Sequence, residues 1–202
     1  MASEKTICVY CSSSEAIDIV YFQAAREIGQ MMGARGHTLI YGGGRMGLMG
    51  EVARAVQAAG GRVIGVIPEA LMAQCYNLAD EIITTRDMRE RKATMEARAD
   101  AFIGLPGGFG TLEEILEILT LKQLRHHEKA IVLANVAGYF DHLLEVFEHL
   151  YIQQFAKAEY RALYYVTSSA EEALNHIDQY VPVALPDKLF DPHSMADPRL
   201  PE

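Results

Sequence analysis

Seven short apolar runs, each five to seven residues long, alternate with longer segments of helical periodicity. The runs are rich in β-branched residues and occupy residues 5–10, 37–41, 62–68, 81–85, 100–106, 129–135 and 162–167. Helices are expected near residues 17–34, 46–59, 87–99, 112–125, 139–153 and 169–180. Continuous apolar strands separated by helices pair in a parallel sheet that is covered on both faces. The pattern therefore predicts an α/β fold with a doubly wound parallel sheet and helices on both faces.

The length of the chain, 202 residues, suits one domain, and half of the residues are hydrophobic. We expect a single α/β domain over residues 1–180. Residues 181–202 carry five of the seven prolines, which cannot join a regular helix or a central strand. This tail is expected to be loosely docked or disordered.

The net charge of −9 leaves no basic field that could attract a polyanion, so neither nucleic acid nor an anionic membrane surface is an expected partner. The N-terminus lacks the pattern of a signal peptide, and no apolar stretch approaches the roughly 20 residues of a membrane span. Cys8 and Cys11 form a C-x-x-C within a predicted strand, where their side chains would point to opposite faces. Buried thiols in a reducing cytoplasm are the expected interpretation.

Two glycine-rich turns follow predicted strands, and each precedes a predicted helix. They are YGGGRMGLMG at residues 41–50 and LPGGFGTLEE at residues 105–114. Glycine lets a ligand approach the backbone closely, and a helix that begins there offers unpaired N–H donors and a positive dipole end. Two such turns at the carboxyl edge of a sheet predict a nucleotide site, although tight turns and close packing alone would also favour glycine. Gly42, Gly44 and Gly47 match G-x-G-x-x-G, but a turn after the second strand is a weak indication of a classical NAD site.

Glu114 is a candidate catalytic carboxylate. A helical wheel places it between Ile118 and Leu121, whereas Glu113 lies on a different face. A carboxylate with apolar neighbours beside a glycine crevice suits acid–base or electrostatic catalysis. Thr111 and Glu114 also read T-x-x-E, a capping box in which both residues would be structural. Spacing alone leaves both roles open.

Arg91 is a second candidate, since it lies on the helical face that Met88 and Met95 define as inward. A guanidinium on that face needs an anionic partner. The alternative is a snorkelling arginine, or an ion pair with Glu90 or Glu96 on the same helix. The neighbouring Lys92 is open to the same two interpretations.

The histidines form no cluster with metal-ligand spacing. His142 and His149 share one helical face, where solvent exposure is the expected outcome. No metal site is therefore predicted.

The motifs together resemble those of one known family. PGGFGTLEE matches P-G-G-x-G-T-x-x-E, and it follows YGGGRMGLMG and RERK in the order and spacing of the "Lonely guy" (LOG) phosphoribohydrolases, once labelled lysine decarboxylases. The resemblance extends from about residue 5 to residue 180. It implies a Rossmann-like fold, a homodimer or larger oligomer, and hydrolysis of the N-glycosidic bond of a nucleoside 5′-monophosphate. The substrate would be a cytokinin riboside monophosphate, AMP or both, and no cofactor or metal would be needed.

The resemblance also implies roles for individual residues. The family's catalytic arginine and glutamate fall on Arg91 and Glu114. Expected substrate contacts are Ser13, Gly43, Gly44, Lys92, Gly107, Gly108, Phe109, Gly110, Thr111, Leu112, Glu113 and Thr120.

One departure from the family pattern lies in the first turn, which reads CSSS where the family usually has C-G-S-S. Ser12 therefore adds a Cβ that could change how Ser13 and Ser14 approach a ligand. The segment MAQCYNLAD at residues 72–80 also lacks the acidic residue that many plant members carry near the base.

Two other functions stay open at this point. A nucleotide or molybdenum-cofactor carrier would share the fold and the anion-binding turns but would not need a poised carboxylate. A pyridoxal phosphate decarboxylase would need a Schiff-base lysine, for which Lys92 is the only candidate, in a chain about half the usual length.

Overall fold

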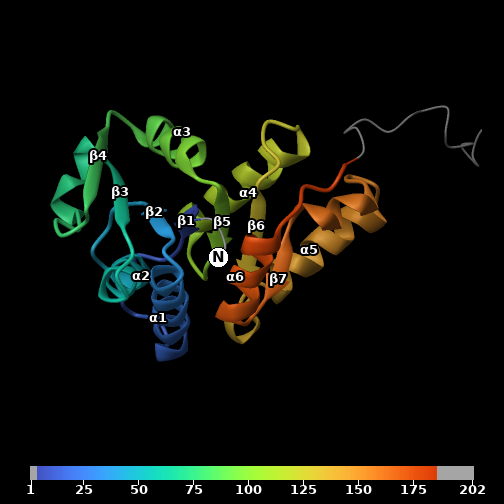
Figure 1. Cartoon of the computed structure of the whole chain (residues 1–202). Coiled ribbons are helices and arrows are strands. Elements are labelled where there is room, and N and C mark those ends of the chain that lie inside the picture. Colours follow the sequence, from blue (N-terminus) through green and yellow to red (C-terminus); the bar gives the residue numbers. More distant parts are fainter. Residues whose placement is uncertain (1–3, 186–202) are drawn as a thin grey trace, which may run out of the picture.

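A computed structural model describes residues 4–185, whose seven strands form one parallel sheet in the order β4-β3-β2-β1-β5-β6-β7 (Figure 1). The strands are β1 (Thr6–Tyr10), β2 (Thr38–Tyr41), β3 (Val63–Pro68), β4 (Glu81–Thr85), β5 (Ala101–Gly104), β6 (Ala130–Ala134) and β7 (Tyr165–Thr167). Every pairing is parallel, with Cys8 of β1 between Ile40 of β2 and Phe102 of β5. The predicted α/β fold and all seven predicted strands are confirmed.

All six predicted helices are also confirmed. They are α1 (Ile19–Ala34), α2 (Gly47–Ala58), α3 (Met88–Arg98), α4 (Phe109–Gln123), α5 (Asp141–Ile152) and α6 (Ala170–Gln179). Three short 3-10 helices were not predicted, namely η1 (Glu69–Gln74), η2 (Val136–Gly138) and η3 (Ala158–Leu163). They lie in connections, where no long apolar periodicity marks a helix.

The sheet separates two hydrophobic cores. Ile7 and Val9 of β1 pack with α1, α2 and α6, whereas Cys8 and Tyr10 pack with α3, α4 and α5. Figure 1 shows the two groups of helices on opposite faces of the sheet. Cys11 belongs to the first core and Cys8 to the second, so the predicted divergence of the C-x-x-C thiols is confirmed.

The start of α4 differs from the sequence prediction in a way that matters for the site. The helix begins at Phe109 with Gly108 as its N-cap, three residues before the predicted start at residue 112. Thr111 and Glu114 therefore both lie inside the helix, and no side chain caps it. The capping-box interpretation of T-x-x-E is wrong, because the chain already turns helical within the glycine run.

The strand order creates a topological switch point at the carboxyl end of β1. The direction of chain progression reverses at β1, which pairs with β2 on one side and β5 on the other. In open parallel sheets, ligands bind beyond the carboxyl ends of the strands at such a reversal. The turns after β1, β2 and β5 all lie at this point.

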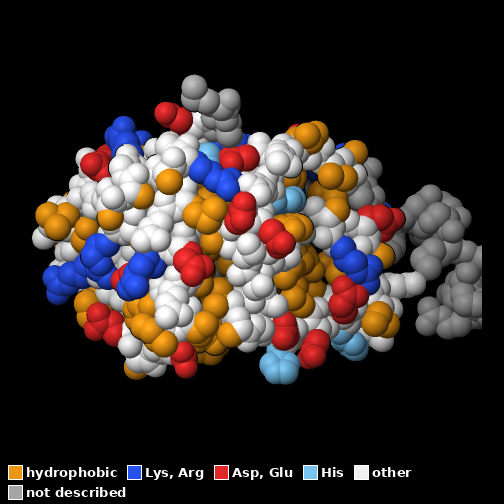
Figure 2. Space-filling model, turned by 60° about the horizontal axis from the view of Figure 1, so that its bottom comes forward, with side chains coloured by type: hydrophobic (Ala, Val, Ile, Leu, Met, Phe, Trp, Pro, Cys, Tyr) orange, Lys and Arg blue, Asp and Glu red, His pale blue; other side chains and the backbone are white. Residues whose placement is uncertain are grey.

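The surface carries mixed charge. On the face shown in Figure 2, acidic and basic side chains lie interspersed among apolar ones. Within the described residues, no helix is long and apolar enough to cross a bilayer. The predicted tail is described only as far as Leu185, where it has no helix or strand, and its remainder lies outside the described residues.

Candidate active site

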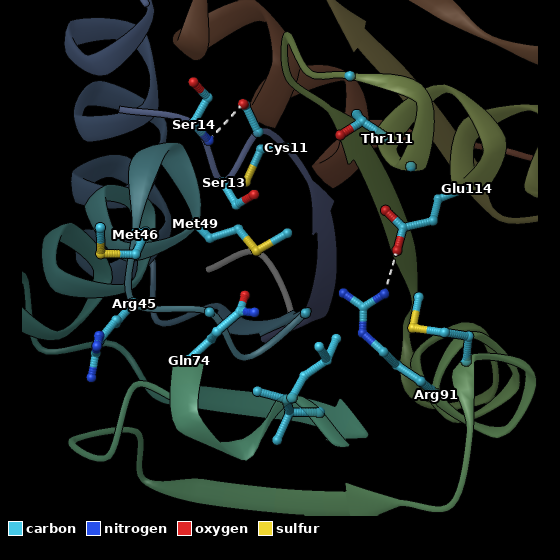
Figure 3. A pocket seen from close by; sticks show the side chains of 18 of the residues that line it. Cys11, Ser13, Ser14, Arg45, Met46, Met49, Gln74, Arg91, Thr111 and Glu114 are labelled. Carbon is cyan, nitrogen blue, oxygen red and sulfur yellow. Dashed lines mark hydrogen bonds and ion pairs between the residues drawn. The ribbon is translucent and has the colours of Figure 1, made fainter. Parts of the chain in front are cut away.

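A crevice of about 440 Å³ opens at the carboxyl ends of the central strands, where three turns converge with the start of α3 (Figure 3). Its lining residues come from the first half of the chain and from the start of α4. They are Cys11, Ser12, Ser13, Ser14, Gly42, Gly44, Arg45, Met46, Met49, Ile67, Leu71, Gln74, Met88, Arg91, Gly108, Gly110, Thr111, Glu113 and Glu114.

The first turn follows β1 and ties the other two turns together through Ser12. The backbone N–H of Ser12 donates to the carbonyl of Pro106, and the Ser12 carbonyl accepts from the N–H of Met49. Its hydroxyl oxygen accepts from the N–H of Ser14 at 3.0 Å. The serine that replaces the family's usual glycine thus holds the loop in shape, and both Ser13 and Ser14 still line the crevice.

The second turn follows β2 and makes room for Arg91. A Cβ on Gly42 would lie 1.8 Å from Nη2 of Arg91, far inside van der Waals contact. Gly43 has a φ of +72°, a conformation that favours glycine. The predicted glycine requirement here therefore has two physical causes, of which only the first concerns the site directly.

The third turn follows β5 and leads into α4. A Cβ on Gly107 would lie 2.1 Å from Oγ1 of Thr111, so this glycine is required by packing. Gly108 and Gly110 differ, because a Cβ on either would meet nothing within 4 Å and neither has positive φ. They leave open space at the N-terminus of a 15-residue helix, whose first N–H groups have no intrahelical acceptor. An anion can bind there without a lysine.

Two hydrogen bonds hold the third turn against neighbouring segments. The hydroxyl of Tyr139, just after η2, donates a short hydrogen bond to the carbonyl of Gly107. The backbone N–H of Leu105 donates to the carbonyl of Tyr10. These two bonds fix the approach to α4 from both sides.

Arg91 and Glu114 form a buried ion pair at the crevice wall. Nη1 of Arg91 donates to Oε1 of Glu114 at 2.8 Å, and Nε donates to the carbonyl of Val66 at 3.2 Å. The two residues are 6% and 5% exposed, so the pair is largely desolvated while it still lines the crevice. A buried pair with this geometry is expensive to break, because the remaining charge would lack a partner.

The pairing identifies the anionic partner of Arg91, which the sequence left open. Arg91 pairs with neither Glu90, which binds Arg86, nor Glu96, which lies near Lys129. The alternative of a local ion pair along α3 is therefore wrong. The expected inward stripe holds for Met95, which is fully buried, but Met88 is exposed in the crevice wall.

The electrostatic balance at Glu114 is set by burial and by its partner. Burial raises the pKa of the Glu114 carboxyl, and the Arg91 guanidinium opposes this only in part, so the pKa stays above its usual value of 4.5. The thiol of Cys11, also in the crevice, has a pKa that burial raises well above the usual range. Cys11 is therefore protonated at neutral pH and does not supply a thiolate nucleophile.

Lys92 lies beside the crevice and is held by two carboxylates. Its ammonium forms a short hydrogen bond with Glu113 and an ion pair with Glu117 at 3.0 Å. Burial disfavours the ammonium, but the bonds to both carboxylates outweigh it and raise the pKa of Lys92. Lys92 is thus protonated and occupied, which is the opposite of what a Schiff-base nucleophile requires.

The structure brings together about half of the predicted site residues. Arg91, Glu114, Ser13, Gly44, Gly108, Gly110, Thr111 and Glu113 line the crevice. Gly43, Gly107 and Leu112 lie in or next to the same turns without lining it, and Phe109 is 93% exposed at the start of α4. Thr120 lies away from the crevice, where its hydroxyl donates to the carbonyl of Leu116.

An apolar wall of the crevice was not predicted. The apolar wall is defined as the apolar side chains that line the crevice, namely those of Met46, Met49, Ile67, Leu71 and Met88, and the polar residues Gln74 and Arg45 also line the crevice. Met46 and Met49 belong to the quoted glycine turn, so their position after β2 was a usable signal. Leu71 and Gln74 lie on η1. The backbone N–H of Arg45 donates to the carbonyl of Gln74 and so joins η1 to the second turn. No sequence pattern predicts this contact.

No group of three or more His, Cys, Asp or Glu side chains within residues 4–185 has the arrangement of a metal site. His142 and His149 are both exposed on α5, as predicted.

The fold is that of a Rossmann-like α/β protein, and its crevice combines the start of α4 with a buried guanidinium–carboxylate pair. Residues 49–177 match the family model described as "Possible lysine decarboxylase". The chain is 44% identical over 176 residues to the probable cytokinin riboside 5′-monophosphate phosphoribohydrolase LOGL1 of Oryza sativa subsp. japonica, covering 86% of this chain and 79% of that protein. It is 41% identical to LOG5 of Arabidopsis thaliana, which carries the same enzyme name, over 89% of this chain and 79% of that protein. The chain belongs to this LOG family of phosphoribohydrolases.

Solved structures confirm the fold. The molybdenum cofactor carrier protein of Chlamydomonas reinhardtii superposes with a TM-score of 0.69 at 22% identity, over 88% of this chain and 97% of that chain. The molybdenum cofactor binding protein of Rippkaea orientalis gives 0.65 at 20% identity, over 88% of this chain and 97% of that chain. At these identities the likeness concerns the arrangement of the sheet and helices alone.

Proposed function

We propose that this protein hydrolyses the N-glycosidic bond of a nucleoside 5′-monophosphate to give a free base and ribose 5-phosphate. The substrates would be cytokinin riboside monophosphates, AMP or both. The observation that carries the proposal is the buried ion pair of Arg91 and Glu114 in the crevice of a chain whose relatives are named phosphoribohydrolases. A carrier needs the anion-binding turns, but it does not need a desolvated carboxylate aimed into the crevice.

The proposed reaction transfers the glycosyl group to water. As the bond between C1′ and the base nitrogen breaks, its electron pair leaves with the base and positive charge develops on the sugar. The Glu114 carboxylate stabilises that charge and accepts a proton from the attacking water, whose oxygen bonds to C1′. The released base takes up a proton. The guanidinium of Arg91 holds Glu114 in position, and its Nη2, which has no hydrogen-bond acceptor among residues 4–185, is available to the substrate.

The 5′-phosphate is proposed to bind at the start of α4. Gly108 and Gly110 leave space there, and Thr111 adds a hydroxyl at the crevice surface. The helix dipole and the free N–H groups favour a doubly charged phosphate in a chain whose net charge is negative. Ser13 and Ser14 of the first turn line the same crevice.

The base is proposed to lie against the apolar wall. Met46, Met49 and Met88 offer flexible, polarisable side chains that can pack on a purine and on an apolar N6 substituent. This supports a cytokinin base as one substrate. The amide of Gln74 at the edge of the wall can both donate and accept hydrogen bonds, as recognition of an adenine edge requires.

A homodimer and a cytoplasmic location are part of the same proposal. Exposed apolar residues on α4 and α5, among them Leu116, Val146 and Ile152, would be covered in a dimer. Three buried free thiols, those of Cys8, Cys11 and Cys75, suit a reducing compartment.

The direct test is incubation of the purified protein with AMP and, separately, with N6-isopentenyladenosine monophosphate. Chromatography should detect the free base and ribose 5-phosphate in equal amounts, and the ratio of the two rates should identify the preferred base. Tight binding of either nucleotide without release of base would overturn the proposal and favour a carrier.

Replacement of Gly110 by alanine should separate stability from binding. Because the added methyl group meets no protein atom, we expect the free energy of unfolding to stay the same or rise by about 0.5 kcal/mol. The same methyl group would stand where the phosphate is proposed to bind, so KM should rise by about tenfold, or about 1.4 kcal/mol. Urea unfolding and steady-state kinetics of the same preparation measure both effects. An unchanged KM would show that the ligand does not approach this glycine.

A further inference from the structure

A lysine ammonium is buried near the amino ends of β6 and β7, whereas the crevice lies at the carboxyl ends of the strands. Lys122, on the last turn of α4, is 4% exposed and forms no ion pair with any carboxylate among residues 4–185. Its Nζ donates to the carbonyl of Leu163 at 2.8 Å and lies 4.9 Å from the centre of the Tyr180 ring. An ammonium has three donors, so this carbonyl and the ring face do not satisfy it.

Burial of a charge without a counterion is unfavourable, and buried charges in proteins normally have a partner. Burial lowers the pKa of Lys122 to about 8, so the group still carries its charge at neutral pH. An anion that reached Nζ would remove this unfavourable state.

Two cavities adjoin Lys122. Their volumes are about 250 and 400 Å³, and Lys122, Tyr180 and Val183 line both. Glu128 lines the smaller cavity, but it is exposed and forms no ion pair with Lys122 in the described part of the chain. Among residues 4–185, no carboxylate therefore lies within ion-pair distance of Nζ of Lys122.

The larger cavity has an aromatic wall. The ring of His176 stacks on Tyr165 at 4.3 Å between centroids, and Tyr180 lies at 5.6 Å on a tilted plane. All three line the cavity, and burial lowers the pKa of His176, with the Lys122 charge as a further cause. The wall is therefore uncharged at neutral pH, and it suits a flat or apolar ligand body.

The cavities are separate from the crevice. α4 begins in the crevice and runs back along the sheet, so Glu114 and Lys122, eight residues apart, are separated by about 12 Å along the helix axis. The cavities lie near the amino ends of β6 and β7, where Ile131 and Tyr165 contribute to their lining. No residue lines both this region and the crevice.

We propose that these cavities form a second ligand site for a small organic anion. A carboxylate or phosphate group would bind Nζ of Lys122, and an apolar or aromatic body would lie against Tyr180, His176 and Val183. The proposal does not depend on the reaction in the crevice.

The test uses the full chain with ¹³C-labelled lysine and observes the lysine side chains by NMR while benzoate or phenyl phosphate is added. Replacement of Lys122 by methionine, which has a similar length and no charge, assigns the signal. We expect a saturable shift of the Lys122 signal and an upward move of its titration midpoint from about 8, because a bound anion favours the ammonium. Saturation by either anion supports the proposal, and the ratio of the two affinities identifies the preferred headgroup.

Two controls make the test specific. Benzamide has the ring without the charge and should not saturate the site. Lys5 matches Lys122 in donating to a helix carbonyl, that of Ile177 at 2.9 Å, but it lines neither cavity. Lys5→Met should keep the affinity for benzoate, whereas Lys122→Met should lose at least about tenfold. Equal affinity in Lys122→Met, or no saturable shift in the wild type, would overturn the proposal.

Discussion

Replacement of Glu114 by glutamine is expected to lower kcat by about 10³-fold while the protein remains folded. Glutamine keeps the shape of the side chain and an oxygen that can accept from Nη1 of Arg91, now 2.8 Å from Oε1. It removes the negative charge that would stabilise a positively charged sugar and the group that would accept a proton from water. Steady-state release of base, with circular dichroism and urea unfolding to check the fold, measures the effect.

A matched control distinguishes the loss of this carboxylate from the loss of any paired carboxylate. Glu148 also binds a guanidinium, that of Arg161, but on the exposed surface of α5 and η3. Glu148→Gln should keep full activity. Wild-type activity in Glu114→Gln would exclude the proposed mechanism, even if the enzyme released base.

The protonation of Glu114 gives this prediction a second signature. Since burial raises its pKa above 4.5, the carboxylate form is lost as pH falls through that raised value. The acid limb of kcat should therefore lie above pH 4.5 in the wild type and be absent from the residual activity of Glu114→Gln.

The sequence was sufficient to predict the strands of the sheet because the sequence pattern of a buried parallel strand is local. Each apolar run needs only its own residues to be recognised, and all seven lie where the pattern predicts. The inward direction of Glu114 could likewise be predicted from Ile118, four residues further on, because helix periodicity is also local.

Contacts between side chains on different helices and strands could not be predicted from such local patterns. Arg91 and Glu114 are 23 residues apart on two helices, and only the packing of α3 and α4 on one face of the sheet brings them to 2.8 Å. From spacing alone, Glu90 and Glu96 were equally good partners for the arginine. Gly42 shows the same limit, because its need to be glycine comes from the Arg91 side chain and not from its own turn.

Replacement of Arg91 by methionine is expected to lower the free energy of unfolding by about 3 kcal/mol at pH 8 and kcat by about 10²-fold. The buried Glu114 carboxylate would lose its partner, and Nη2 would no longer face the substrate. Without the guanidinium, the pKa of Glu114 should rise further, because burial is already the larger influence on it. A carboxyl group with a higher pKa in the folded state binds its proton more tightly there than in the unfolded state. The free energy of unfolding therefore falls as pH rises from about 4.5 through the folded-state pKa. Urea unfolding at pH 5.5 and pH 8 should therefore show a smaller loss at the lower pH.

The double variant Arg91→Met/Glu114→Gln tests whether this loss comes from the unpaired charge. A neutral amide beside a methionine leaves no buried charge, so the double variant should be more stable than Arg91→Met at pH 8 by about 1 to 2 kcal/mol, with little dependence on pH. Its activity should be no higher than that of Glu114→Gln. If the two substitutions add within about 0.5 kcal/mol, the pair is not coupled and the loss in Arg91→Met comes from packing. Recovered stability without recovered activity would mean that the ion pair is retained for a charge on Glu114 that the fold itself does not need.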